Sequence, residues 1–192
     1  SQAESIYKQI LLVDEKNSDA LHLLGVIAHQ MGDHLLSVEM ISQAIEINSN
    51  VANYYSNLAS ALIELKQFEA AISNCKKALL LKIDFAEAYT NLGLALKELK
   101  KFEVAIECYD KAIALSPNLA EAYSNKAIVL LELKQFEAAM ASCNMAIELK
   151  PDFASAYLNR GIALHALKLF DAAVASYDKA ISLNPNYAEA YN

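Results

Sequence analysis

Glycine, proline and tryptophan are scarce in this sequence of 192 residues, which has 4 Gly, 3 Pro and no Trp. Sheet-rich folds need many tight turns, and tight turns depend on Gly, Pro and Asn for their backbone angles. Hydrophobic residues nevertheless make up 55% of the chain, which is ample apolar material for a core. Few turn formers and abundant Ala, Leu and Glu together predict an all-helical protein.

Clusters of Lys and Arg are also missing, and the net charge is −7. Nucleic-acid binders neutralise phosphates with grouped cations, and an acidic surface is repelled by anionic lipid. No apolar run approaches the ~18 residues of a membrane span. We therefore expect neither a nucleic-acid partner nor a membrane partner.

The sequence lacks the residue constellations of common active sites. It has no G-x-S-x-G, no phosphate-binding glycine-rich loop and no Cys/His cluster. His22 and His29 lie seven residues apart, a poor spacing for chelation, and are expected to be exposed on one helix face. Three cysteines without short pairing spacings give no disulfide framework, which favours a reducing, cytoplasmic compartment. We expect no enzyme activity, no metal and no cofactor.

The main positive feature is a sequence repeat of 34 residues. The segments that begin at Ala86, Ala120 and Ala154 align without gaps, and two earlier segments fit the same register. A fixed period in this range indicates a repeat architecture. Full repeats are expected at 18–51, 52–85, 86–119, 120–153 and 154–187. Residues 1–17 fit the second helix of a partial repeat and residues 188–192 the start of a further one, so we expect a section of a longer protein.

Each repeat shows the pattern of two packed helices. Counted from the first residue of the repeat, positions 8, 20 and 27 are small, and positions 4 and 17 are mostly aromatic. Small side chains let helices approach closely, and apolar spacings of three and four predict two amphipathic helices. Pro117 and Pro151 follow second helices, where a proline cannot continue the helix. Asn118 and Asp152 are predicted to cap the next first helix.

The turn between the two helices holds Gly32 in the first full repeat and lysine in the others. The lysines are Lys66, Lys100, Lys134 and Lys168. A left-handed backbone at this position would cost each lysine about 1 kcal/mol or less. The alternative is that the first helix runs on slightly.

These features resemble the tetratricopeptide repeat (TPR), and the likeness covers nearly the whole chain. The resemblance implies an all-α, right-handed α-solenoid of antiparallel helix pairs. It also implies that the first helix of each pair lines a concave groove that holds a protein or peptide.

Position 6 of the repeat would form a ladder of amides along that groove: Asn57, Asn91, Asn125 and Asn159. A carboxamide donates and accepts, so it can pair with the backbone of an extended peptide. The ladder is similar to that in the TPR arm of the O-linked N-acetylglucosamine transferases, which hold extended substrates. The alternative is that each amide bonds to an adjacent helix.

Other groove positions suggest the chemistry of the partner. Leu94, Ile128 and Ile162 would supply apolar contact, and the acidic residues include Glu98 and Glu132, with Lys97 as the one base. This composition predicts a neutral or basic peptide with apolar side chains. Alternatively, the charges only keep an exposed face soluble.

A few residues depart from the repeat pattern. Lys126 and Arg160 replace leucine at position 7 and are expected to extend toward the groove rim. Cys75 and Cys143 occupy position 24, a core position where cysteine acts as a small hydrophobe. Cys108 lies one position earlier and is expected to be more exposed.

The sequence thus predicts a protein–protein interaction scaffold that binds an extended peptide or partner protein. Two alternatives stay open. The segment could be the substrate-recognition arm of a larger enzyme of glycosyltransferase type, or a self-assembling scaffold that stacks end to end through its repeats.

Overall fold

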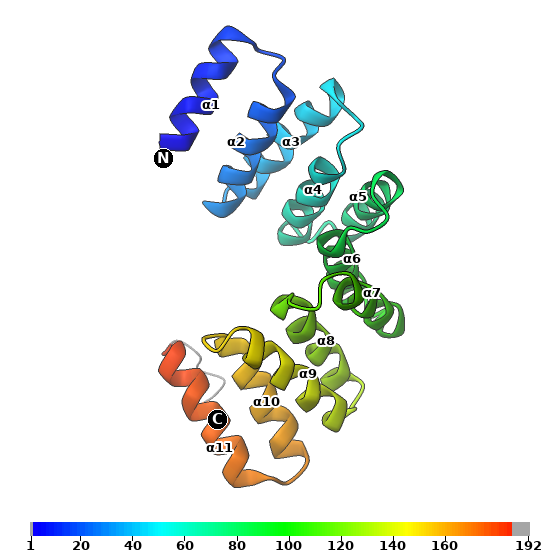
Figure 1. Cartoon of the computed structure of the whole chain (residues 1–192), viewed down its shortest axis with the longest axis vertical. Helices are drawn as coiled ribbons and strands as arrows, with labels where there is room; N and C mark the ends of the chain where they lie inside the picture. Colours follow the sequence, from blue (N-terminus) through cyan, green and yellow to red (C-terminus); the bar gives the residue numbers. More distant parts are fainter. Residues whose placement is uncertain (1, 186–192) are drawn as a thin grey trace. The chain divides into compact units, whose positions relative to one another are not determined.

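The computed structural model describes residues 2–185, where the regular structure consists of eleven α-helices without a strand (Figure 1). They are α1 (Gln2–Val13), α2 (Ser18–Gln30), α3 (His34–Ile47), α4 (Ala52–Glu64), α5 (Phe68–Leu81), α6 (Ala86–Glu98), α7 (Phe102–Leu115), α8 (Ala120–Glu132), α9 (Phe136–Leu149), α10 (Ala154–Ala166) and α11 (Phe170–Leu183). The segment 188–192, predicted to start a further repeat, lies outside the described residues.

The chain divides into two compact units, Ser1–Leu99 and Lys100–Asn192, so the boundary falls between α6 and α7. In the first unit, α2 pairs with α3 and α4 pairs with α5. Each second helix also packs on the first helix that follows it (α1 on α2, α3 on α4, α5 on α6), and the first helices contact one another. The core of this unit therefore lies both within the hairpins and between successive ones, which stack in chain order (Figure 1).

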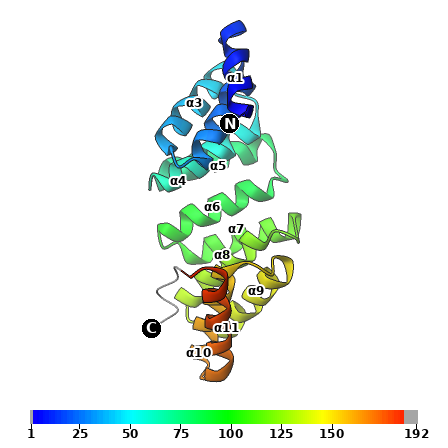
Figure 2. The same cartoon turned by 90° about the vertical axis from the view of Figure 1, so that its left-hand side faces the viewer.

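The second unit repeats the same arrangement with α7 to α11. Helix α8 pairs with α9 and α10 pairs with α11, while α7 packs on α8 and α9 packs on α10 (Figure 2). Leu130, Ala139 and Ala163 form a buried cluster there, with Ile106 and Met140 packed against it. Residues of α7, α8, α9 and α10 thus share one core.

The helix pairs approach closely because the residues at positions 8 and 24 are complementary in size. A Cβ atom on Gly25 would lie 2.6 Å from Cγ1 of Ile41, and one on Gly161 would lie 2.3 Å from Cε1 of Tyr177. Both distances are shorter than a van der Waals contact, so a large residue at position 24 requires glycine at position 8.

The second and fourth repeats carry the smaller combination of alanine and cysteine at these two positions. Ala59 and Cys75 are fully buried, as are Ala127 and Cys143, which confirms the core position predicted for the two cysteines. Burial raises the pKa of Cys143 to about 12. Cys108 is only slightly more exposed, at 6%, and is still buried, so burial raises its pKa to about 11.

The turns inside the hairpins adopt the left-handed conformation. Gly32 has φ of 84°, and the four lysines at the same position have φ between 56° and 62°. In the fourth repeat the N–H of Lys134 donates to Leu131 O and the N–H of Gln135 donates to Leu130 O. This is the Schellman arrangement that ends a helix. The first helix therefore ends at the turn and does not run on.

The predicted helix caps are wrong by one residue. Helix α8 has Leu119 as its N-cap and α10 has Phe153, and neither residue offers a side-chain hydrogen bond. The N–H of Leu119 instead donates to Ser116 O at 3.2 Å, which makes Pro117 and Asn118 the central residues of a β-turn. The helix consequently begins after the turn has closed.

Candidate functional site

The first helices of the first unit are joined by polar side chains that bond across repeats. The amide nitrogen Nδ2 of Asn57 on α4 lies 2.8 Å from Nε2 of His22 on α2. Because an amide nitrogen only donates, Nε2 accepts, and the neutral imidazole carries its proton on Nδ1. The expectation of an exposed His22 is wrong: the side chain packs against the ring of Tyr54 at 4.5 Å and is 8% exposed. Burial lowers the pKa of His22.

Asn91, the next amide of the predicted ladder, bonds in a similar way. Its Nδ2 on α6 donates to the backbone carbonyl of Ser56 on α4 at 3.1 Å. Asn57 and Asn91 therefore both use their amide N–H groups to tie one repeat to the repeat before it. This geometry matches the alternative in which position 6 bonds to the adjacent helix.

The second unit places several predicted site residues around one depression. Its volume is about 460 Å³. It is lined by Ile128, Leu131, Glu132, Lys134, Phe136, Asn159 and Ile162. Four predicted residues thus meet on the first helices α8 and α10: one amide, two isoleucines and one carboxylate. The depression offers apolar surface and an amide together.

The other predicted residues are more dispersed. Leu94 is half-buried on α6, and Asn125 is half-buried on α8. Nζ of Lys97 lies 2.7 Å from Oε1 of the neighbouring Glu98, so this base and this acid neutralise each other locally. They add little net charge to the face of α6.

A histidine network near the end of α2 was not anticipated from the sequence. Nδ1 of His29 lies 3.1 Å from Nδ1 of His34, and its Nε2 lies 3.2 Å from Oγ of Ser60 on α4. Burial is the main reason that the pKa of His29 is lowered, and His34 lowers it further. His29 is at position 12 of the first repeat and Ser60 is at position 9 of the second. A comparison of position 12 in one repeat with position 9 in the next could have suggested this pair.

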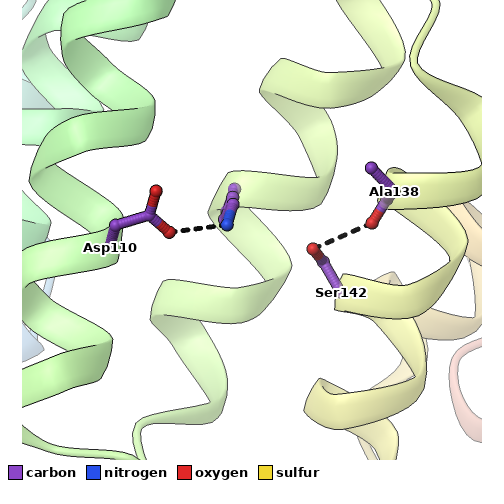
Figure 3. A network of polar contacts seen from close by, with 4 residues as sticks. Asp110, Ala138 and Ser142 are labelled. Atoms are coloured by element: carbon purple, nitrogen blue, oxygen red, sulfur yellow. Dashed lines mark hydrogen bonds and ion pairs between the residues drawn. The ribbon is translucent and has the colours of Figure 1, made fainter.

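Lys126 and Arg160 do not extend toward the groove rim, contrary to the prediction. Nζ of Lys126 on α8 lies 2.5 Å from Oδ1 of Asp110 on α7, and Figure 3 shows Asp110 on the opposite side of α8 from Ser142 of α9. Arg160 on α10 bonds Oγ of Ser176 at 3.1 Å and Oδ1 of Asn144 at 3.4 Å. Both cations therefore point to the second helices, where position 25 of the preceding repeat supplies an acceptor.

Stacked helical hairpins with complementary residues recurring in every repeat define an α-solenoid repeat protein. The tetratricopeptide-repeat family matches residues 18–51, 52–82, 86–119, 120–153 and 154–187. The chain belongs to the tetratricopeptide-repeat family, and the predicted all-α solenoid class is confirmed. This fold is typical of protein–protein interaction.

Several solved structures resemble the chain. MamA is 26% identical, with a TM-score of 0.71 over 86% of this chain and 97% of its own. PilF of Pseudomonas aeruginosa is 23% identical with a TM-score of 0.81, covering 92% of this chain and 80% of its own. YrrB, a TPR protein with an unusual peptide-binding site, is 18% identical with a TM-score of 0.68, covering 96% and 95%. The comparison with curated proteins gave no match.

Two further observations concern the described part of the chain. No helix within residues 2–185 has both the length and the apolar character needed to cross a bilayer. Within that range, no three His, Cys, Asp or Glu side chains are grouped so that they could hold a metal ion.

Proposed function

We propose that this protein is a scaffold whose first helices bind an extended segment of a protein partner. The observation that carries the proposal is the depression of the second unit, where Asn159 lies beside Ile128 and Ile162. An extended peptide needs hydrogen-bonding groups for its backbone and apolar surface for alternate side chains. The depression offers both on two neighbouring helices.

The exposure of these residues supports a role in binding. Ile162 is 42% exposed although isoleucine is usually buried, so a partner side chain can reach it. Asn159 is half-buried in the same depression. A single net hydrogen bond contributes about 1 kcal/mol, and burial of an aliphatic side chain contributes a similar amount or more. The isoleucines therefore supply much of the affinity, and the amide fixes the orientation of the backbone.

The charge of the chain favours a neutral or basic segment. The net charge is −7, and Glu132 at the rim of the depression is exposed. Long-range attraction raises the association rate of oppositely charged partners. Lys134 also lines the depression, and its charge can pair with one acidic group in the bound segment.

In this proposal Asn57 and Asn91 have a structural role and do not contact the bound segment. Their amide N–H groups are bonded to His22 and Ser56, so they hold adjacent first helices in register. We expect their replacement to affect stability more than affinity. The TPR protein YrrB is described as having a peptide-binding site, which is consistent with peptide binding by this fold.

The test is selection of binding peptides followed by substitution in the depression. Random dodecapeptides displayed on phage are selected on the whole chain, and their affinities are measured by fluorescence anisotropy. We expect Asn159→Ala with Ile162→Ala to weaken binding about tenfold or more. Asn144→Ala and Val174→Ala, an amide and an exposed aliphatic side chain on the second helices, serve as matched controls.

Circular dichroism shows whether each variant is folded. The proposal fails if every selected peptide binds the folded double variant as tightly as it binds the unchanged chain. It also fails if the two control substitutions weaken binding as much as the pair in the depression.

A further inference from the structure

The second helix of the second repeat ends in an apolar surface that the other repeats do not share. Leu80 is 87% exposed and Ile83 is 72% exposed. At the position of Leu80 the first and fourth repeats have Glu46 and Glu148, both exposed. At the position of Ile83 the last three repeats have proline. These two residues are therefore departures from the repeat, and packing within the described unit does not require them.

Leu81 extends this surface and borders a hollow. It is 44% exposed and, with Leu80, lines a hollow of about 170 Å³ that also includes Ser49, Tyr55 and Lys77. We call Leu80, Leu81 and Ile83 the α5 patch, which lies where α5 meets the loop to α6 (Figure 1). Exposed apolar side chains beside a concavity are a common feature of interaction sites.

Three lysines surround the α5 patch. Lys76 and Lys77 lie one helical turn before Leu80 and Leu81, which places them on the same side of α5. Lys82 follows directly. Nζ of Lys77 lies 5.5 Å from the ring centroid of Tyr55, and Nζ of Lys82 lies 4.9 Å from that of Phe85. Cation–π contacts of this kind restrict the lysines and keep their charge near the surface.

The local charge is opposite to that of the whole chain. Residues 76–85 contain three lysines and one acid, Asp84, whereas the chain as a whole carries −7. A basic rim around apolar residues complements a segment with the opposite pattern, because complementary potentials give specificity while apolar contact gives affinity.

We propose that the α5 patch docks an acidic, apolar segment of a partner protein, in which aspartate or glutamate flanks one or two large apolar side chains. The apolar side chains cover Leu80 and Ile83 and enter the hollow beside Tyr55. The acidic groups pair with Lys76, Lys77 and Lys82. This surface is on a second helix and is independent of the depression between α8 and α10, so each proposal can fail without the other.

The test uses substitutions that the repeat itself supplies. Leu80→Glu with Ile83→Pro introduces the residues found at the same positions in other repeats, so this variant is expected to fold. Lys76→Asp introduces the residue found at that position in the third and fifth repeats. A dodecapeptide library is selected on the unchanged chain and depleted on the Leu80→Glu/Ile83→Pro variant, and the remaining peptides are measured by anisotropy.

We expect the remaining peptides to be rich in Asp or Glu together with Leu or Phe. Their affinity should fall about tenfold or more in the Leu80→Glu/Ile83→Pro variant and about threefold or more in Lys76→Asp. A matched control moves the apolar pair to the fourth repeat: Glu148→Leu with Pro151→Ile is added to the Leu80→Glu/Ile83→Pro variant. There Asn144 and Met145 replace Lys76 and Lys77, and only Lys150 remains, at the position of Lys82, so full binding should not return.

Several results would overturn the proposal. One is that no peptide is lost on the variant, or that the lost peptides are not acidic. Full return of binding in the transplanted variant would show that Lys76 and Lys77 are not needed. Binding to vesicles of phosphatidylcholine and phosphatidylserine through Leu80, without peptide binding, would assign the patch to a membrane. A dimer in sedimentation that Leu80→Glu abolishes would assign it to a second copy of the chain.

Discussion

The size match between positions 8 and 24 predicts a reversal in the effect of one substitution. Gly161→Ala should destabilise the unchanged chain but stabilise a chain that also carries Tyr177→Cys. A Cβ atom on Gly161 would lie 2.3 Å from Cε1, 2.5 Å from Cδ1 and 2.9 Å from Cζ of Tyr177. Alanine at this position therefore forces the tyrosine ring or the two helices apart. The fourth repeat carries Ala127 and Cys143 at the same positions, both fully buried.

The magnitude follows from two opposing contributions. Overpacking of a core costs about 1–3 kcal/mol, and alanine in place of glycine inside a helix stabilises by about 1 kcal/mol. The net effect of Gly161→Ala in the unchanged chain is a loss of up to about 2 kcal/mol. With Tyr177→Cys the ring is gone and the clash with it, so a gain of about 1 kcal/mol remains. The coupling free energy between the two sites is then about 1–3 kcal/mol.

The assay is a double-mutant cycle in urea, followed by circular dichroism. Because repeat arrays need not unfold in one step, the free energies are fitted with a nearest-neighbour model, and hydrogen exchange of α10 and α11 gives a local measure. Ala127→Gly and Cys143→Tyr form the reciprocal cycle in the fourth repeat. Cys143→Tyr should be tolerated better when Ala127→Gly is present.

Equal effects of Gly161→Ala in both backgrounds would refute the reasoning. The clash would then be relieved elsewhere, and glycine at position 8 would need another explanation. A reciprocal cycle without coupling would limit the size match to the fifth repeat.

Three further predictions follow from single residues. Ser37→Ala should raise the free energy of unfolding by about 1–2 kcal/mol, measured in urea, because Oγ of Ser37 is buried without a hydrogen-bond partner in the described chain and other repeats have alanine there. Lys134→Gly should stabilise by up to about 0.5 kcal/mol, since relief of about 1 kcal/mol of left-handed strain exceeds the added entropy cost of glycine. An equal or lower urea midpoint would contradict it. Stability should fall as pH drops below about 6.5, because burial holds the pKa values of His22 and His29 below those of the unfolded chain, which then binds protons more readily. His22→Ser, the serine of two other repeats, should reduce this dependence in urea titrations at several pH values.

The repeat in the sequence was sufficient to predict the helical class and the core, because a period of 34 residues compares each position with its equivalents. The Ile and Tyr residues at the same position of other repeats predict that Cys75 and Cys143 are core residues. The left-handed turn at Lys66 was likewise suggested by Gly32. In both cases the residue at the equivalent position of another repeat indicates the local structure.

Contacts between repeats were harder to predict, because they join different positions. The position of Lys126 alone predicts the groove rim, but its partner Asp110 is at position 25 of the preceding repeat. The partner of Asn57 is His22, at position 5 of the preceding repeat. The helix caps were also predicted incorrectly. The turn at Pro117 and Asn118 is closed by a hydrogen bond from the N–H of Leu119 to Ser116 O, so α8 begins one residue later than predicted.

A comparison of equivalent positions in successive repeats also separates residues that serve the fold from residues that are available for binding. Position 27, which is alanine in every repeat, is fully buried, as at Ala146 and Ala180, and is explained by packing. Leu80 and Ile83 are large and apolar where other repeats have Glu, Ala, Ser or Pro, and both are largely exposed. Hydrophobic side chains that neither the repeat nor the core requires are the strongest candidates for contact with a partner, so the α5 patch is expected to differ in function from the face of the first helices.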